Sequence, residues 1–96
     1  MGIAIYGVTL FSQNPWTDAQ KSAVQRACRE VLRALKPEEP PPSEEEVAAY
    51  WEAHVESPTS AYWQFYDDHR EAGLLYAHFE THCCPLGMKV TSHFSI

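Results

Sequence analysis

The histidines of the C-terminal third have the clearest chemical potential in this sequence. Residues 74–82 alternate in polarity with the two-residue period of a β-strand, and residues 88–96 form a second such pattern, in which His93 points outward. The outward side chains of the first pattern include Tyr76, His78, Glu80 and His82. We therefore expect a sheet face with imidazoles and a carboxylate in one cross-strand neighbourhood, where opposed Cβ atoms lie about 5 Å apart.

Such a cluster suits a zinc site with an open coordination position, because zinc binds nitrogen and oxygen ligands. The candidate ligands are His78, His82 and His93. The register of the expected hairpin stays open, and it decides whether Glu80 opposes Thr91 or His93. The same residue types are also ordinary on the solvated face of a sheet. We prefer that interpretation, and we assign no metal ion, no cofactor and no catalytic residue.

Four further patterns predict the elements that position this face. Residues 3–11 form an apolar strand, in which Gly7 indicates a bulge or a close approach by another group. An amphipathic helix with a basic outer face follows, opened by Asn14-Pro15 or by a Thr17 capping box and ending near Lys36. A second helix is expected at about 44–56, opened by a Ser43 capping box and ending before Pro58. A strand is expected at 61–66, followed by a hairpin turn at 67–73.

The expected order is therefore β-α-α-β-β-β. It predicts an α+β fold in which a mainly antiparallel sheet is packed on one face by two helices. We expect residues 1–96 to form a single domain, with a Pro/Glu-rich connector between the helices at 37–43.

The charge and the cysteine content of the chain exclude some classes of function. The net charge is −6, and residues 37–73 contain ten carboxylates against one arginine, which argues against direct binding of a nucleic-acid backbone. No apolar run approaches the length of a membrane-spanning helix. Three cysteines without framework spacing indicate reduced thiols, as expected in the cytoplasm.

Aromatic residues give the strongest sequence argument for a protein interface. Tyr is enriched at binding hot spots, and three tyrosines are expected beside the histidines on the uncovered side of the sheet. The predicted contact residues are Tyr62, Tyr66, Tyr76, His78, Glu80 and His93, together with the acids Glu38, Glu39, Asp67 and Asp68.

The sequence thus predicts a non-catalytic, cytoplasmic protein-binding module that docks on a larger protein. Its acidity favours a partner with a basic, nucleic-acid-handling surface, and inhibitors of the immunity or anti-defence kind often share this size and charge. The alternative is a small zinc-dependent enzyme or metal-binding protein that uses the histidine face. A homodimer whose sheet faces pack together is a third interpretation.

Overall fold

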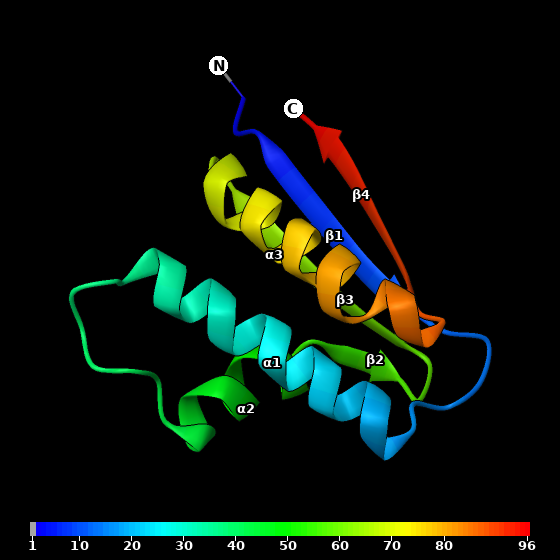
Figure 1. The fold of residues 1–96 in the computed structure, drawn as a ribbon. Coiled ribbons are helices and arrows are strands. Elements are labelled where there is room, and N and C mark those ends of the chain that lie inside the picture. Colours follow the sequence, from blue (N-terminus) through cyan, green and yellow to red (C-terminus); the bar gives the residue numbers. More distant parts are fainter. Residues whose placement is uncertain (1) are drawn as a thin grey trace.

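The computed structural model describes residues 2–96, which form a four-stranded sheet and three α-helices. The elements in chain order are β1 (Ile5–Phe11), α1 (Asp18–Leu35), α2 (Glu44–Glu52), β2 (Val55–Ser57), β3 (Ser60–Tyr66), α3 (His69–His82), a single 3₁₀ turn (Cys84–Leu86) and β4 (Lys89–Ser95). Helices α1 and α3 run side by side in opposite directions over one face of the sheet (Figure 1). The α+β class and the antiparallel sheet expected from the sequence are confirmed.

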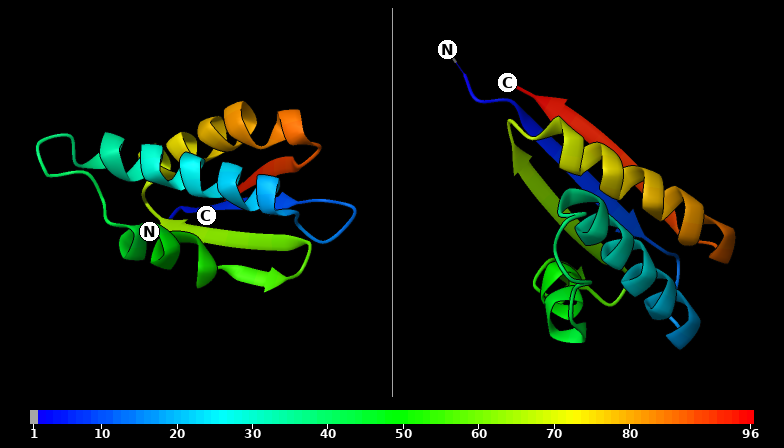
Figure 2. Two further views of the ribbon diagram at one scale, coloured as in Figure 1. Left: turned by 60° about the horizontal axis from the view of Figure 1, so that its bottom comes forward. Right: turned by 60° about the vertical axis from the view of Figure 1, so that its left-hand side comes forward.

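The strand order is β2-β3-β1-β4, and every neighbouring pair is antiparallel. With α1 between β1 and β2, and α3 between β3 and β4, this is the split β-α-β-β-α-β arrangement of ferredoxin-like domains. Helix α2 is an addition to that arrangement and lies beside α1, near the β2 edge (Figure 2). Strands β3 and β1 are the two inner strands, so the N-terminal apolar run is paired on both sides.

One predicted element is wrong: residues 74–82 are not a strand but the greater part of α3. The buried residues of α3 are Ala72, Leu75 and Phe79, spaced three and four apart as on one side of a helix. A spacing of four is also a multiple of two, so Leu75 and Phe79 fit a strand pattern equally well. Asp68, expected in a hairpin turn, is the N-cap of α3 and accepts a hydrogen bond from the backbone N–H of Glu71 at 3.0 Å.

The second helix is also shorter than expected, because α2 ends at Glu52 rather than near residue 56. The chain then forms the short strand β2, in which Val55 pairs with Ala61 and Ser57 with Ser60. The His54 ring stacks on Trp63, with the ring centroids 5.2 Å apart. Hairpin pairing with β3 therefore ends the helix before Pro58, the residue that the sequence predicts as its stop.

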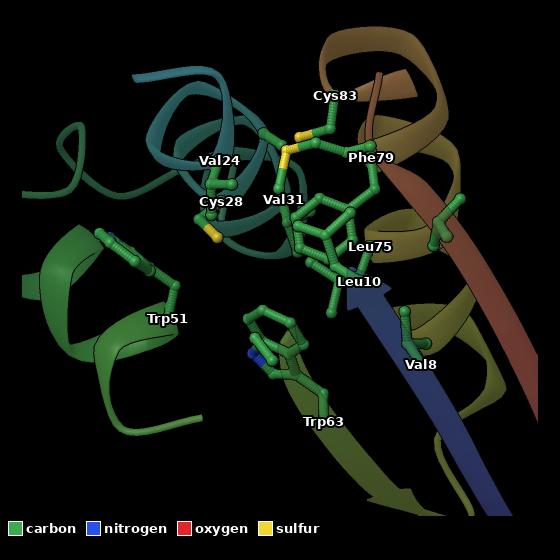
Figure 3. Close-up of a cluster of buried hydrophobic side chains, with 14 of the residues drawn as sticks. Val8, Leu10, Val24, Cys28, Val31, Trp51, Trp63, Leu75, Phe79 and Cys83 are labelled. Carbon is green, nitrogen blue, oxygen red and sulfur yellow. The ribbon is translucent and has the colours of Figure 1, made fainter. Parts of the chain in front are cut away.

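The core lies between the sheet and its helices, and Trp63 is its largest fully buried side chain. Trp63 packs on Phe79 of α3, with ring centroids 5.1 Å apart, and its indole N–H donates to the backbone oxygen of Tyr50 at 2.9 Å. Figure 3 shows α1, β1 and α3 contributing to the same cluster through Val24, Leu10 and Leu75 among others. One tryptophan thus ties β3 to α3 by packing and to α2 by a hydrogen bond.

The N-terminus of α1 is closed by a capping box in which Thr17 and Gln20 bond each other's backbone N–H groups. The basic side of α1 contacts the chain's own acidic middle. Arg29 pairs with Glu44 at 3.2 Å, and Lys36 pairs with Glu39 at 3.8 Å. Across residues 2–96, none of the helices combines the length and the apolar character needed to cross a membrane.

Candidate functional site

The face of the sheet opposite the helices, here called the open face, is not covered by any helix of the described chain (Figure 2). The alternation of side chains along each strand shows which residues lie on the open face. Val8, Leu10, Ala61 and Trp63 point into the core, so the residues next to them in sequence point to the open face. The open face consists of Ile5, Gly7, Thr9 and Phe11 of β1, Ser60, Tyr62, Gln64 and Tyr66 of β3, and Lys89, Thr91, His93 and Ser95 of β4.

At the centre of the open face, the imidazole of His93 lies across β1 and reaches β3. His93 and Tyr62 come from strands that do not pair with each other, yet their rings stack with centroids 5.7 Å apart and planes within 2° of parallel. The Tyr62 Oη and His93 Nε2 atoms are 3.2 Å apart and share a hydrogen bond.

Gly7 makes this arrangement possible. A Cβ atom at Gly7 would lie 2.1 Å from His93 Cε1 and 2.5 Å from His93 Nε2, well inside van der Waals contact. The backbone of Gly7 is not in the left-handed region, so the close approach and not the backbone conformation requires glycine here. The close approach that the sequence indicated is therefore present, and the approaching group is His93.

The open face is aromatic and nearly free of charge. None of the open-face residues of β1, β3 and β4 is Asp or Glu, although the chain as a whole has a net charge of −6. Lys89 is its one lysine, and the Nζ atom lies 5.8 Å from the centre of the Phe11 ring. Tyr66 is 62% exposed and stands opposite Ile5 in the register. Such a surface offers contact area with a small desolvation penalty.

The structure divides the predicted contact residues into two groups. Tyr62, Tyr66 and His93 lie on the open face, as expected. Tyr76, His78 and Glu80 do not, because they belong to α3, which covers the opposite side of the sheet. The single histidine-rich face expected from the sequence therefore does not exist.

The predicted metal ligands are divided in the same way. His78 and His82 are one helical turn apart on α3, with ring centroids separated by 5.8 Å and planes within 4° of parallel. Burial lowers the pKa of His82, the charges of His78 and Arg26 lower it further, and Glu30 opposes the shift. His93 lies on the opposite side of the sheet from His78 and His82. Among residues 2–96, no three His, Cys, Asp or Glu side chains are grouped so that they could hold a metal ion.

Two of the four acids predicted as partner contacts, Asp67 and Asp68, form hydrogen bonds with the backbone of the chain itself. The Asp67 carboxylate accepts the backbone N–H of Ala4 at 2.9 Å, and the Asp67 N–H donates to the Ala4 oxygen, so this residue fixes the start of β1. Asp68 caps α3. Glu38 and Glu39 are exposed in the connector between α1 and α2, and only Glu39 is paired, with Lys36. The connector glutamates are the acids that remain available.

The contact residues predicted from the sequence include none from β1, although β1 contributes to the open face. Ile5, Thr9 and Phe11 stand beside Tyr66, Tyr62 and Lys89 in the register and complete the surface between the two outer strands. The signal was present, because both sides of residues 3–11 are apolar and only one side can face the core.

The thiols do not belong to this surface. Burial raises the pKa of the Cys28 thiol, and it raises the pKa of the Cys83 thiol to about 12. Both residues are buried and all three cysteines are free thiols. Cys28 and Cys83 therefore remain protonated at neutral pH and are poor nucleophiles.

The geometry thus defines a small ferredoxin-like domain with one aromatic sheet face exposed. Residues 1–83 match the family described as ER-bound oxygenase mpaB/B'/Rubber oxygenase, catalytic domain, and since the match spans most of the sequence the chain belongs to this family. No curated protein and no solved structure matches the chain.

Oxygenases as a class use haem, flavin, copper or non-haem iron for dioxygen chemistry. The described residues bring together no three metal ligands, and none of their charged or polar side chains is buried. Residues 2–96 therefore do not fit a resident metal centre held by several side chains, and we derive no reaction step through one.

Proposed function

We propose that this chain is a non-catalytic protein-binding module whose open face docks on a larger protein. The observation that supports this proposal best is the His93–Tyr62 pair over Gly7. It places two stacked rings at the centre of a sheet surface without carboxylates, and Tyr66 adds an exposed ring beside them. Aromatic anchors on a rigid backbone lose little conformational entropy on binding.

The acids of the connector and of α2 are not among the open-face residues of β1, β3 and β4. Glu38 and Glu39 are in the connector at 37–43, and Glu44, Glu45 and Glu46 form the first turn of α2. An acidic domain with a neutral contact face is attracted toward a basic partner by long-range charge, and it then makes contact without burying ions. A cytoplasmic inhibitor of a nucleic-acid-handling protein, in the manner of immunity or anti-defence proteins, fits this division of charge.

A capture experiment with matched variants tests the proposal. The tagged chain is used to capture proteins from its native host, beside Tyr62→Ala/His93→Ala on the open face and His78→Ala/His82→Ala on α3. Each variant removes two neighbouring rings, so the two match in size and differ in location. We expect one dominant partner that the α3 variant retains and the open-face variant loses. Equal capture by both variants contradicts the proposal.

The oligomeric state is measured in parallel, because a second copy is another occupant that the open face could accept. Light scattering of the purified chain should give the mass of one chain, 10.9 kDa. If the chain forms a stable dimer that the Tyr62→Ala/His93→Ala substitutions dissociate, the occupant of the open face is a second copy of the chain and not a different protein.

The family match favours a second candidate, an oxygenase or other metal-dependent enzyme. For this chain the available ligands are the His78–His82 pair, since two histidines four residues apart on a helix can bind one metal ion together. Elemental analysis and an absorption spectrum of protein purified from its native host decide between the candidates. Stoichiometric metal that His78→Ala/His82→Ala removes favours the enzyme, whereas protein without metal or chromophore favours the binding module.

A further inference from the structure

A second surface feature lies on the helix side of the sheet, where α3 does not cover β4 completely. Strand β4 is at the edge of the sheet. Helix α3 contacts β1 and β4 and has α1 on its other side, so no further helix lies beyond α3 toward β4 (Figure 1). Phe94 points to the helix side opposite Tyr6, yet 56% of its surface is exposed. Between α3 and β4 there is a groove of about 400 Å³, here called the α3–β4 groove.

The walls of the α3–β4 groove are aromatic and its floor is made of small residues. The Tyr6 ring packs against Phe94 and His69, with centroid distances of 5.0 and 6.2 Å. Tyr76 lies on the α3 side, and Ser92 and Gly73 leave space between the rings. No lysine, arginine or carboxylate lines the groove, so its surface suits an uncharged occupant.

Gly73 is the observation that points to an occupant. It is the fifth residue of α3, where glycine is less favourable than alanine by about 0.5–1 kcal/mol. A Cβ atom at this position would have no neighbour within 4 Å, and the residue has no positive φ angle. Neither packing within the chain nor backbone conformation therefore explains the glycine. Gly73 lines the α3–β4 groove, where a larger side chain would occupy part of its space.

We infer that the α3–β4 groove is a binding site for a small, flat, uncharged and largely apolar molecule. Its volume lies within the range of about 300–1,000 Å³ that is usual for small-molecule sites. Aromatic walls stack on planar rings, and the hydroxyls of Tyr76 and Ser92 and the His69 imidazole can bond one polar group of the ligand. The groove opens on the helix side of the sheet, although Gly7 and His93 of the open face also border it. The inference does not depend on the proposed partner.

The test uses prodan, a neutral naphthalene fluorophore with one carbonyl, whose emission shifts to the blue in apolar sites. Wild-type protein is titrated beside Gly73→Ala, Gly73→Leu and Ala77→Leu. Ala77 is the matched control, since it is exposed one turn further along α3 and does not line the groove. We expect one blue-shifted site in the wild type, affinity at least ten-fold lower in Gly73→Leu, and wild-type affinity in Ala77→Leu.

Gly73→Ala separates binding from stability. It removes a helix glycine without a clash, so its melting temperature should rise by a few degrees while its affinity for prodan falls at least three-fold. The inference is overturned if the wild type binds no prodan below 1 mM, or if Gly73→Leu binds as the wild type does. If the wild type forms a dimer that Gly73→Leu dissociates, the α3–β4 groove binds a second copy of the chain and not a small molecule.

Discussion

The contact between His93 and Gly7 can be measured as a coupling free energy. The substitution Gly7→Ala places a methyl group 2.1 Å from the His93 ring. Because the ring is the free end of an exposed side chain, it should rotate away and leave the backbone unchanged. The ring then loses its stacking with Tyr62, about 0.5–1.5 kcal/mol for an aromatic pair, and an exposed hydrogen bond of about 0.5 kcal/mol.

An opposite effect comes from the backbone, since alanine in a strand interior is favoured over glycine by about 0.5–1 kcal/mol. In the wild-type background, Gly7→Ala should therefore lower the free energy of unfolding by roughly 0–1.5 kcal/mol, the difference between these effects. In a His93→Ala background no ring is displaced, and the same substitution should raise it by about 0.5–1 kcal/mol. The expected coupling is about 1–2 kcal/mol, as measured for residues in contact.

Urea unfolding of the four proteins, followed by tryptophan fluorescence, measures this coupling, because the buried Trp63 reports the loss of the core. Gly7→Ala/His93→Ala completes the cycle and controls for the glycine effect alone. If the effects of the two substitutions add within about 0.3 kcal/mol, His93 does not lie on Gly7, and the arrangement at the centre of the open face is wrong.

Three further predictions concern the helix side. Phe79→Ala should lower the free energy of unfolding by about 3–5 kcal/mol, because Phe79 is fully buried against Trp63; a loss below 1 kcal/mol in urea would contradict this packing. In an NMR titration the pKa of His82 should lie below its usual value and rise in His78→Gln, and since the folded state then favours the neutral ring, stability should fall as the pH drops below about 6.5; an unshifted His82 refutes this. At pH 8 a thiol reagent should modify Cys84 alone in the native protein and all three cysteines in urea, because burial raises the pKa of Cys28 and Cys83; rapid native labelling of three thiols would disprove it.

The sequence correctly predicted the elements whose residue pattern fits only one type of secondary structure. The capping residues Thr17 and Ser43, together with the stripe of buried residues on α1, identify the first two helices. Residues 3–11 and 88–96 contain β1 and β4, and residues 61–66 form all of β3 except its first residue. Gly7 indicated a close approach, which His93 makes.

Residues 74–82 show why the remainder could not be predicted. Within one short segment, buried residues four apart satisfy both the strand and the helix period, and the Asp68 cap that favours a helix also suits a turn. The pairing of Tyr62 with His93 depends on β1 lying between β3 and β4, and that strand order is a property of the whole sheet. Local patterns identified the residue types of the open face, and the sheet order determined which of them meet.

The central claim is that the open face contacts a partner, and site-specific photocrosslinking in the native host tests it most directly. A photoreactive phenylalanine analogue replaces Tyr66 on the open face in one strain and Glu80, exposed on α3, in another. We predict a discrete adduct with one larger protein from position 66 and none from position 80. An adduct from position 80 without one from position 66 would contradict the proposed function.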